Sequence, residues 1–337
     1  MDVWQSSRVL PPRYLLPPVN ALNRVRRRLQ SLWRNPPQRF EGATIQYQSG
    51  QFIIVGDLQR TSRIEFWRKS NTTEQRLLMQ QITAEAPDFL AIVGDLVFCG
   101  SSVTDWASFD KLAAPLCQAR VPVLPLLGNH DYWFAPRLAL AHFFTRFPHL
   151  GGRHWFSTTY GPLGLIFLDS NVRRLPALQW QKQAEWYQRE LEHFEQASHI
   201  RGVLVLLHHP PYTNSQLVPD DMAVQQTFVP PFLQAGKTLG MVSGHVHSYE
   251  RYERAGKTFL VTGGGGPRSK LATGHRRRHV DDCFGGPPLR GFHYLSLRPL
   301  PEGIEIAMRE LQQHQQVFAT LDRVILPWAT GTAPGAA

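Results

Sequence analysis

Beyond Gly42 the chain alternates between short apolar runs and longer stretches in which apolar residues recur every three or four positions. Short apolar runs are typical of buried strands, and the wider spacing is typical of amphipathic helices. The predicted strands are 51–55, 89–93, 121–127, 163–168, 203–207, 239–242 and 259–261, with two later ones near 292–297 and 303–308. The predicted helices are 73–85, 104–120, 137–147 and 178–196. This alternation of strands and helices predicts an α/β sandwich whose central strands are largely parallel.

Residues 1–41 differ from the rest of the chain. They hold three proline pairs, and eight arginines against two acidic residues. Residues 19–35 favour a helix with apolar residues on one face and arginines on the other. Such a helix could lie on an anionic membrane, so residues 18–35 are a candidate membrane-surface segment. A second interpretation stays open, in which the apolar stripe packs against the main domain.

The composition is that of a globular protein, since 42% of the 337 residues are hydrophobic and 18% are charged. We expect a basic, proline-rich leader over 1–41, a main domain over 42–312 and a small-residue tail over 313–337. The net charge is +10, and more than half of it comes from the leader. The leader lacks the pattern of any nucleic-acid-binding module, so we expect no nucleic acid among the partners.

The cysteines favour a reducing compartment. Three scattered cysteines form neither a disulfide framework nor a zinc ribbon. We also see no apolar run near the ~20 residues that span a bilayer and no secretory signal at the start of the sequence. The expected location is therefore the cytoplasm, with the leader as a possible link to the inner face of the membrane.

Polar clusters follow five of the apolar strands. They are Gly56-Asp57-Leu58-Gln59, Gly94-Asp95, Gly128-Asn129-His130-Asp131, His208-His209-Pro210-Pro211 and Gly244-His245-Val246-His247. Ligands of α/β sheets bind at the carboxyl ends of the strands, and a glycine before the polar residue allows a sharp turn. Taken singly, each cluster has a structural explanation such as a turn, a helix cap or a rigid strand exit, although His-x-His is a stronger ligand signal. Five in succession favour one metal-binding site.

These motifs resemble the calcineurin-like metallophosphoesterase superfamily over about residues 51–265. The segments Gly-His-Val-His-Ser-Tyr-Glu-Arg at 244–251 and His-His-Pro-Pro-Tyr at 208–212 are most similar to the purple acid phosphatase branch. The resemblance implies a four-layer αββα sandwich, in which two mixed β-sheets are flanked by helices. It also implies a metal-dependent hydrolase of phosphoric monoesters, diesters or pyrophosphates, with a small phosphorylated substrate.

The resemblance further implies a centre of two divalent metal ions, which Mn, Fe or Zn would suit. The implied ligands are Asp57, Gln59, Asp95, Asn129, His208, His245 and His247. Asp95 would bridge the two ions. A hydroxide held by the ions would then attack phosphorus in line with the leaving oxygen.

Two positions depart from the family pattern. Gln59 stands where the family has histidine, and an amide offers only a neutral carbonyl oxygen. Phe98 stands where purple acid phosphatases have a tyrosinate ligand, and phenylalanine cannot bind a metal. The first metal position therefore lacks its usual extra ligand, and a ferric centre is not favoured.

The remaining candidates act on the substrate. His130 is the candidate acid for the leaving group, and Asp131 is expected to orient its imidazole. His209, Tyr212 and Arg268 are candidate substrate-binding residues, Arg268 in a basic loop that could equally be a solvated run of charge. The alternative function, favoured by Gln59 and Phe98, is a phosphate-binding or scaffold protein of the same fold with weakened catalysis.

Overall fold

The computed structural model describes residues 36–42, 44–62, 64–65 and 68–329. The candidate membrane-surface segment 18–35 lies outside the described residues. The end of the leader belongs to the folded body, because the backbone N–H of Phe40 donates to the carbonyl of Arg146 and the Phe40 ring is buried. Within the described ranges, no helix is both long and apolar enough to cross a membrane.

The first sheet has six strands in the order β12-β11-β10-β1-β2-β3. Its parallel half consists of β1 (Phe52–Val55), β2 (Leu90–Val93) and β3 (Val123–Leu126). Its antiparallel half consists of β10 (His293–Pro299), β11 (Gly303–Gln312) and β12 (Val317–Pro327). The sheet is therefore mixed, as expected.

The second sheet has six strands in the order β4-β5-β6-β7-β9-β8. Its parallel centre consists of β5 (Leu163–Phe167), β6 (Gly202–Leu206), β7 (Thr238–Ser243) and β9 (Lys257–Thr262). Antiparallel edge strands close it on both sides, namely β4 (Phe156–Tyr160) and β8 (Tyr249–Arg254).

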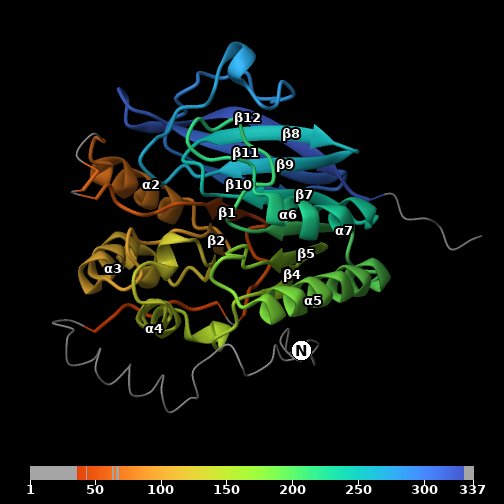
Figure 1. Ribbon diagram of the computed structural model, residues 1–337, viewed down its shortest axis with the longest axis horizontal. Coiled ribbons are helices and arrows are strands. Elements are labelled where there is room, and N and C mark those ends of the chain that lie inside the picture. Colours follow the sequence, from red (N-terminus) through yellow and green to blue (C-terminus); the bar gives the residue numbers. More distant parts are fainter. Residues whose placement is uncertain (1–35, 43, 63, 66–67, 330–337) are drawn as a thin grey trace, which may run out of the picture.

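Helices flank the two sheets on opposite sides (Figure 1). Beside the first sheet lie α2 (Thr72–Ala84), α3 (Val103–Gln118) and α4 (Pro136–Arg146). Beside the second lie α5 (Ala177–Gln196), α6 (Met222–Thr227) and α7 (Val229–Gln234). Short 3-10 turns occur at His130–Tyr132, Pro148–Leu150 and Gly274–Arg276.

Alternation along β6 explains the layering. Leu204 and Leu206 belong to the core between the two sheets. Val203 and Val205 belong to a second core, which the second sheet shares with α5 and α7. Because successive side chains of a strand face opposite sides, a continuous apolar run can supply both cores at once. The four-layer αββα sandwich expected from the resemblance is confirmed.

Three strands lie where no strand was expected. The edge strands β4, β8 and β12 mix polar and apolar residues, so they lack the continuous apolar run used for the prediction. The strand β12 falls inside the segment assigned to the tail, so the sheet extends beyond the boundary drawn at residue 312. An edge strand is less buried than a central strand, so β12 has polar residues at its exposed positions.

The carboxyl ends of the central strands of both sheets meet at one place. The backbone N–H of Asp57, after β1, donates to the Gly94 carbonyl after β2 at 3.0 Å. In the second sheet the N–H of Gly244, after β7, donates to the His208 carbonyl after β6 at 3.0 Å. Between the sheets, the N–H of His245 donates to Oδ2 of Asp57 at 3.0 Å. The loops that carry the predicted site residues are therefore hydrogen-bonded to each other.

Candidate metal centre

Asp57 and Asp95 stand at the turns that end β1 and β2. Both have a left-handed backbone, with φ of 62° and 54°, a conformation that costs a non-glycine residue on the order of 1 kcal/mol or more. Both side chains are buried, at 0% and 1% exposure. Strain and buried charge at the same residues are typical of a binding site.

The glycines beside these turns leave no room for a side chain. Gly94 has φ of 89°, and a Cβ there would lie 2.5 Å from Nδ1 of His208. A Cβ at Gly244 would lie 2.7 Å from Oδ2 of Asp57. The glycine of each motif therefore permits the close approach of the loops that carry the polar residues.

His208 lies at the middle of one half of the site. Its Nδ1 donates to the Val93 carbonyl at 2.9 Å, which aims Nε2 at the other polar groups. From Nε2 the distances are 3.1 Å to Oδ1 of Asn129, 3.2 Å to Nδ1 of His245 and 3.3 Å to Oδ2 of Asp95. Burial disfavours the charged imidazole, but the Asp95 carboxylate outweighs it and raises the pKa of His208 to about 9.

The other half of the site is built around His247. Its Nδ1 donates to the Pro267 carbonyl at 2.8 Å, and its Nε2 lies 3.5 Å from Oδ1 of Asp57. The side-chain amide of Gln59 lies 3.0 Å from the same Nε2 and 3.3 Å from Oδ2 of Asp95. Gln59 therefore lies between the two candidate ligands His247 and Asp95.

His209 joins the site through its neighbour Ser170. The Ser170 hydroxyl accepts the backbone N–H groups of His208 and His209 at 3.2 and 2.9 Å. A hydroxyl accepts two hydrogen bonds and donates one, so its proton goes to Nδ1 of His209, 2.8 Å away. Burial, together with the nearby His208, lowers the pKa of His209 to about 3. His209 is thus neutral with its proton on Nε2.

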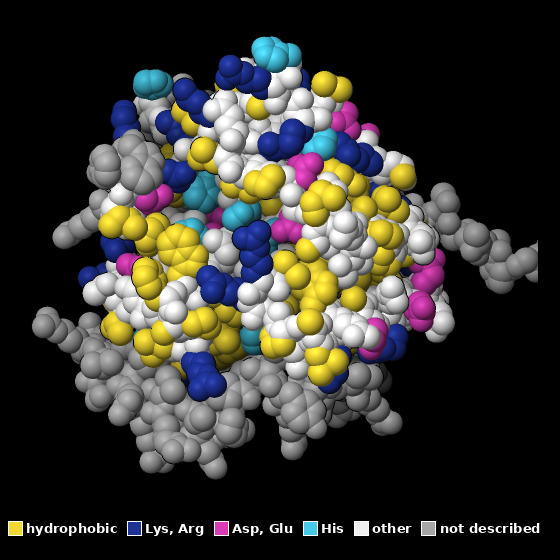
Figure 2. Space-filling view, viewed as in Figure 1, with side chains coloured by type: hydrophobic (Ala, Val, Ile, Leu, Met, Phe, Trp, Pro, Cys, Tyr) yellow, Lys and Arg dark blue, Asp and Glu magenta, His cyan; other side chains and the backbone are white. Residues whose placement is uncertain are grey.

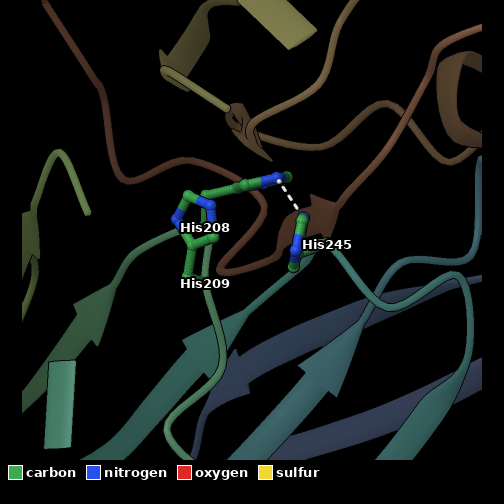
Figure 3. Close-up of side chains that lie close together, drawn as sticks. All are labelled: His208, His209 and His245. Carbon is green, nitrogen blue, oxygen red and sulfur yellow. Dashed lines mark hydrogen bonds between the residues drawn. The ribbon is translucent and has the colours of Figure 1, made fainter. Parts of the chain in front are cut away.

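The three imidazoles form one cluster. His208, His209 and His245 each offer a nitrogen within 4.8 Å of the others, and Figure 3 shows the rings grouped at the ends of β6 and β7. Atoms of Asp57, Asp95 and His208 form a second group with the same limit of 4.8 Å. Figure 2 shows histidine side chains gathered in a hollow of the surface, with cationic side chains along its rim.

This set of donors fits divalent metal ions. The ion-pair partners of the buried Asp57 and Asp95 are histidines, His247 and His208. Metal ions bind imidazole and carboxylate in their deprotonated forms, so a divalent cation would take the place of the proton that Asp95 favours on His208. Mixed carboxylate, amide and imidazole donors are the ligands that Mn²⁺, Fe²⁺ and Zn²⁺ accept.

His130 is held differently from the expectation. Its Nδ1 donates to the Phe98 carbonyl at 2.7 Å, and its ring stacks on Trp133 with 3.7 Å between centroids. The expected pairing with Asp131 is not formed. Asp131 instead accepts backbone N–H groups of the two loops, at 2.9 Å from Asp95, 3.0 Å from Leu96 and 2.9 Å from Gly128. Asp131 therefore fixes the loops that carry the ligands.

Two of the candidate substrate-binding residues have their contacts elsewhere. The Arg254 guanidinium lies 3.8 Å from the centre of the Tyr212 ring, and His279 packs against the same ring. The Arg268 guanidinium lies 5.7 Å from the centre of the Phe292 ring. A role in substrate binding for Tyr212 and Arg268 stays a prediction.

Arg68 and Ser170 border the site but were missed. Nη1 of Arg68 lies 3.4 Å from Nδ1 of His247 and donates to the Pro267 carbonyl at 3.3 Å. Arg68 follows no strand and carries no motif, so nothing in its sequence context could have found it. Ser170 directly follows Asp169 after β5, so a search of every strand end would have included it.

Comparison with known proteins agrees with this geometry. A family model of the calcineurin-like phosphoesterases matches residues 50–249. Purple acid phosphatase 22 of Arabidopsis thaliana is 26% identical over 245 residues, which cover 67% of this chain and 52% of the relative. The chain thus spans about half the length of the curated relatives it matches.

Solved structures share the fold. GAP50 of Plasmodium, described as the anchor in the inner membrane complex, superimposes with a TM-score of 0.67 at 12% identity, covering 84% of this chain and 90% of that one. The purple acid phosphatase PPD1 from yellow lupin (Lupinus luteus) seeds has a TM-score of 0.58 at 17% identity, covering 83% and 54%. The match of the family model to most of the chain, over all the converging loops, means that the chain belongs to the calcineurin-like phosphoesterase family.

Proposed function

We propose that the chain hydrolyses phosphoric esters at a centre of two divalent cations. The observation that carries the proposal is the convergence of two carboxylates, two amides and four imidazoles from five strand ends, all inside the segment that the family model matches. The shared carboxylate of Asp95 lies beside both halves of this set.

Each cation would be held by residues of one half. The first would be held by Asp57, Asp95 and His247, with the carbonyl oxygen of Gln59 as a weak addition. The second would be held by Asp95, Asn129, His208 and His245. Phe98 offers no phenolate, so the proposal favours Mn²⁺, Fe²⁺ or Zn²⁺ over a ferric ion.

When bound, two divalent cations lower the pKa of water and polarise the phosphoryl group. The chain's own residues supply the rest. Nε2–H of His209 donates to a phosphoryl oxygen, because Ser170 fixes the proton on that nitrogen. His130 gives a proton from Nε2 to the leaving oxygen, since the Phe98 carbonyl holds Nδ1–H. Asp131 holds the loop after β2 against the loop after β3 by accepting three backbone hydrogen bonds.

The test combines metal analysis with turnover. The full chain is loaded with Mn²⁺, its metal content is measured by mass spectrometry, and hydrolysis of an aryl phosphate is followed. We expect about two ions per chain and turnover that Asp95→Asn abolishes, because the shared ligand of both ions loses its charge. Full turnover by Asp95→Asn would show that the site is assigned wrongly.

A second candidate function is phosphate binding without catalysis. It is favoured by the Gln59 amide, which lies between His247 and Asp95 where a stronger ligand is expected. In that case metal analysis gives one ion or none. Phosphate then binds, and panels of monoesters and diesters show no turnover.

We also propose that the chain acts in the cytoplasm, at an anionic membrane surface reached through residues 18–35. The arginine-rich, amphipathic sequence of this segment supports the proposal. Sedimentation with anionic vesicles tests it: deletion of residues 1–35 should abolish pelleting, and unchanged pelleting would reject it.

A further inference from the structure

A cavity of about 780 Å³ adjoins the candidate metal centre. It lies between the connection from β1 to α2, the connection from β2 to α3, and the first three turns of α3. A volume of this size is typical of small-molecule sites. None of the residues proposed to hold metal lines it.

The cavity and the centre share a wall. Leu58, in the wall, stands between Asp57 and Gln59 in the chain, and Leu96 directly follows Asp95. Phe98, also in the wall, is the residue whose carbonyl holds the candidate acid His130. Arg68, in the same wall, lies 3.4 Å from Nδ1 of His247, so the cavity borders the centre beside both His130 and His247.

The lining combines apolar and hydroxyl groups. Leu58, Leu96 and Phe109 are buried and supply apolar surface. Six serine and threonine side chains line it as well: Thr61, Ser62, Ser70, Thr72, Thr104 and Ser108. Such a lining suits a ligand with one apolar face and several hydroxyl groups.

The charges of the lining balance. Among the described residues that line the cavity, the charged ones are Arg60, Arg68, Glu65 and Asp105. Arg68 pairs with Glu65 at 3.5 Å, and the charge of Arg60 acts on Asp105. Among these described lining residues the charges balance, so they offer no excess positive charge to a second phosphate, and pyrophosphate is the less favoured substrate.

We propose, resting on the phosphoesterase function above, that this cavity receives the leaving group of the substrate. The substrate class is a phosphate monoester of a neutral, hydroxyl-bearing alcohol with one flat apolar face, of the size of a nucleoside. Hydrolysis breaks the bond between phosphorus and the ester oxygen. Water supplies the new oxygen on phosphorus, and the alcohol departs with a proton from His130.

The test fills the cavity from α3. Ser108→Trp places a large ring in the lining, and Ala107→Trp is the matched control, since Ala107 is exposed on the same helix and does not line the cavity. The full chain with Mn²⁺ is assayed on adenosine 5′-monophosphate, methyl phosphate and pyrophosphate. Binding of adenosine alone is measured by saturation-transfer NMR with Zn²⁺-loaded protein.

For the wild type we expect kcat/KM to be highest for adenosine monophosphate and adenosine alone to bind. Ser108→Trp should lower the ratio of kcat/KM between adenosine monophosphate and methyl phosphate about tenfold or more and abolish adenosine binding, while Ala107→Trp changes neither. An unchanged ratio, or a preference for pyrophosphate, would overturn the inference. If no ester is hydrolysed the proposed function fails, and adenosine binding still decides whether the cavity takes a nucleoside.

Discussion

Replacement of Ser170 by alanine tests whether its hydroxyl holds the backbone of His208 and His209 and the side chain of His209 in place. Ser170 is buried, at 1% exposure, and its hydroxyl accepts the backbone N–H groups of His208 and His209. Each buried N–H left without an acceptor costs about 1–3 kcal/mol. With two such N–H groups, we expect Ser170→Ala to lower the free energy of unfolding by about 2–6 kcal/mol.

Ser243 provides a matched control. It is also 1% exposed, but its hydroxyl makes a single hydrogen bond, a donation to the Leu260 carbonyl at 3.0 Å. Ser243→Ala should lower the free energy of unfolding by only about 1 kcal/mol. Equilibrium urea unfolding of the two variants measures the difference.

The same variant reports on the imidazole of His209. Long-range ¹H–¹⁵N correlation NMR should find the His209 proton on Nε2 in the wild type and a mixture of both tautomers in Ser170→Ala, because the fixed donor to Nδ1 is gone. Equal losses of stability in Ser170→Ala and Ser243→Ala, or a proton on Nδ1 of wild-type His209, would refute this reasoning.

Three further predictions concern other parts of the molecule. His130→Ala should lower kcat roughly a hundredfold to ten-thousandfold with unchanged metal content by mass spectrometry; loss of metal would instead make His130 part of the metal site. Gln59→His should tighten binding of the weaker ion about tenfold to a hundredfold in titrations against a chelating dye, and an unchanged affinity would mean that residue 59 does not border an ion. Burial lowers the pKa of His293 to about 4 from 6.5. The unfolded chain therefore takes up protons first, and the free energy of unfolding falls as the pH drops from 6.5 toward 4. Urea unfolding at several pH values should give a flatter slope for His293→Gln, and an identical slope would contradict the assignment.

The sandwich could be predicted as far as its strands were continuously apolar. Strands such as β1 and β6 are buried on both faces, so their continuous apolar sequences can be recognised from the sequence alone. The edge strands β8 and β12 were not predicted, because partial exposure gives them polar residues among the apolar ones. Sequence therefore predicted the continuously apolar strands, the edge strand β3 among them, and missed the edge strands of mixed polarity.

The candidate ligands could be predicted because each follows a strand whose carboxyl end reaches the same place. The role of Asp131 could not, since it depends on backbone groups of another loop, at Asp95 and Leu96. The position of Arg68 beside the site could not be predicted either, because its contacts with His247 and Pro267 join segments far apart in the sequence. Contacts between loops appear only when the chain is folded.

Anomalous diffraction from crystals of the full chain soaked with Mn²⁺ tests the central claim most directly. The account predicts two peaks on either side of the Asp95 carboxylate, one beside Asp57 and His247 and the other beside Asn129 and His208. A single peak, or peaks away from these side chains, would contradict it.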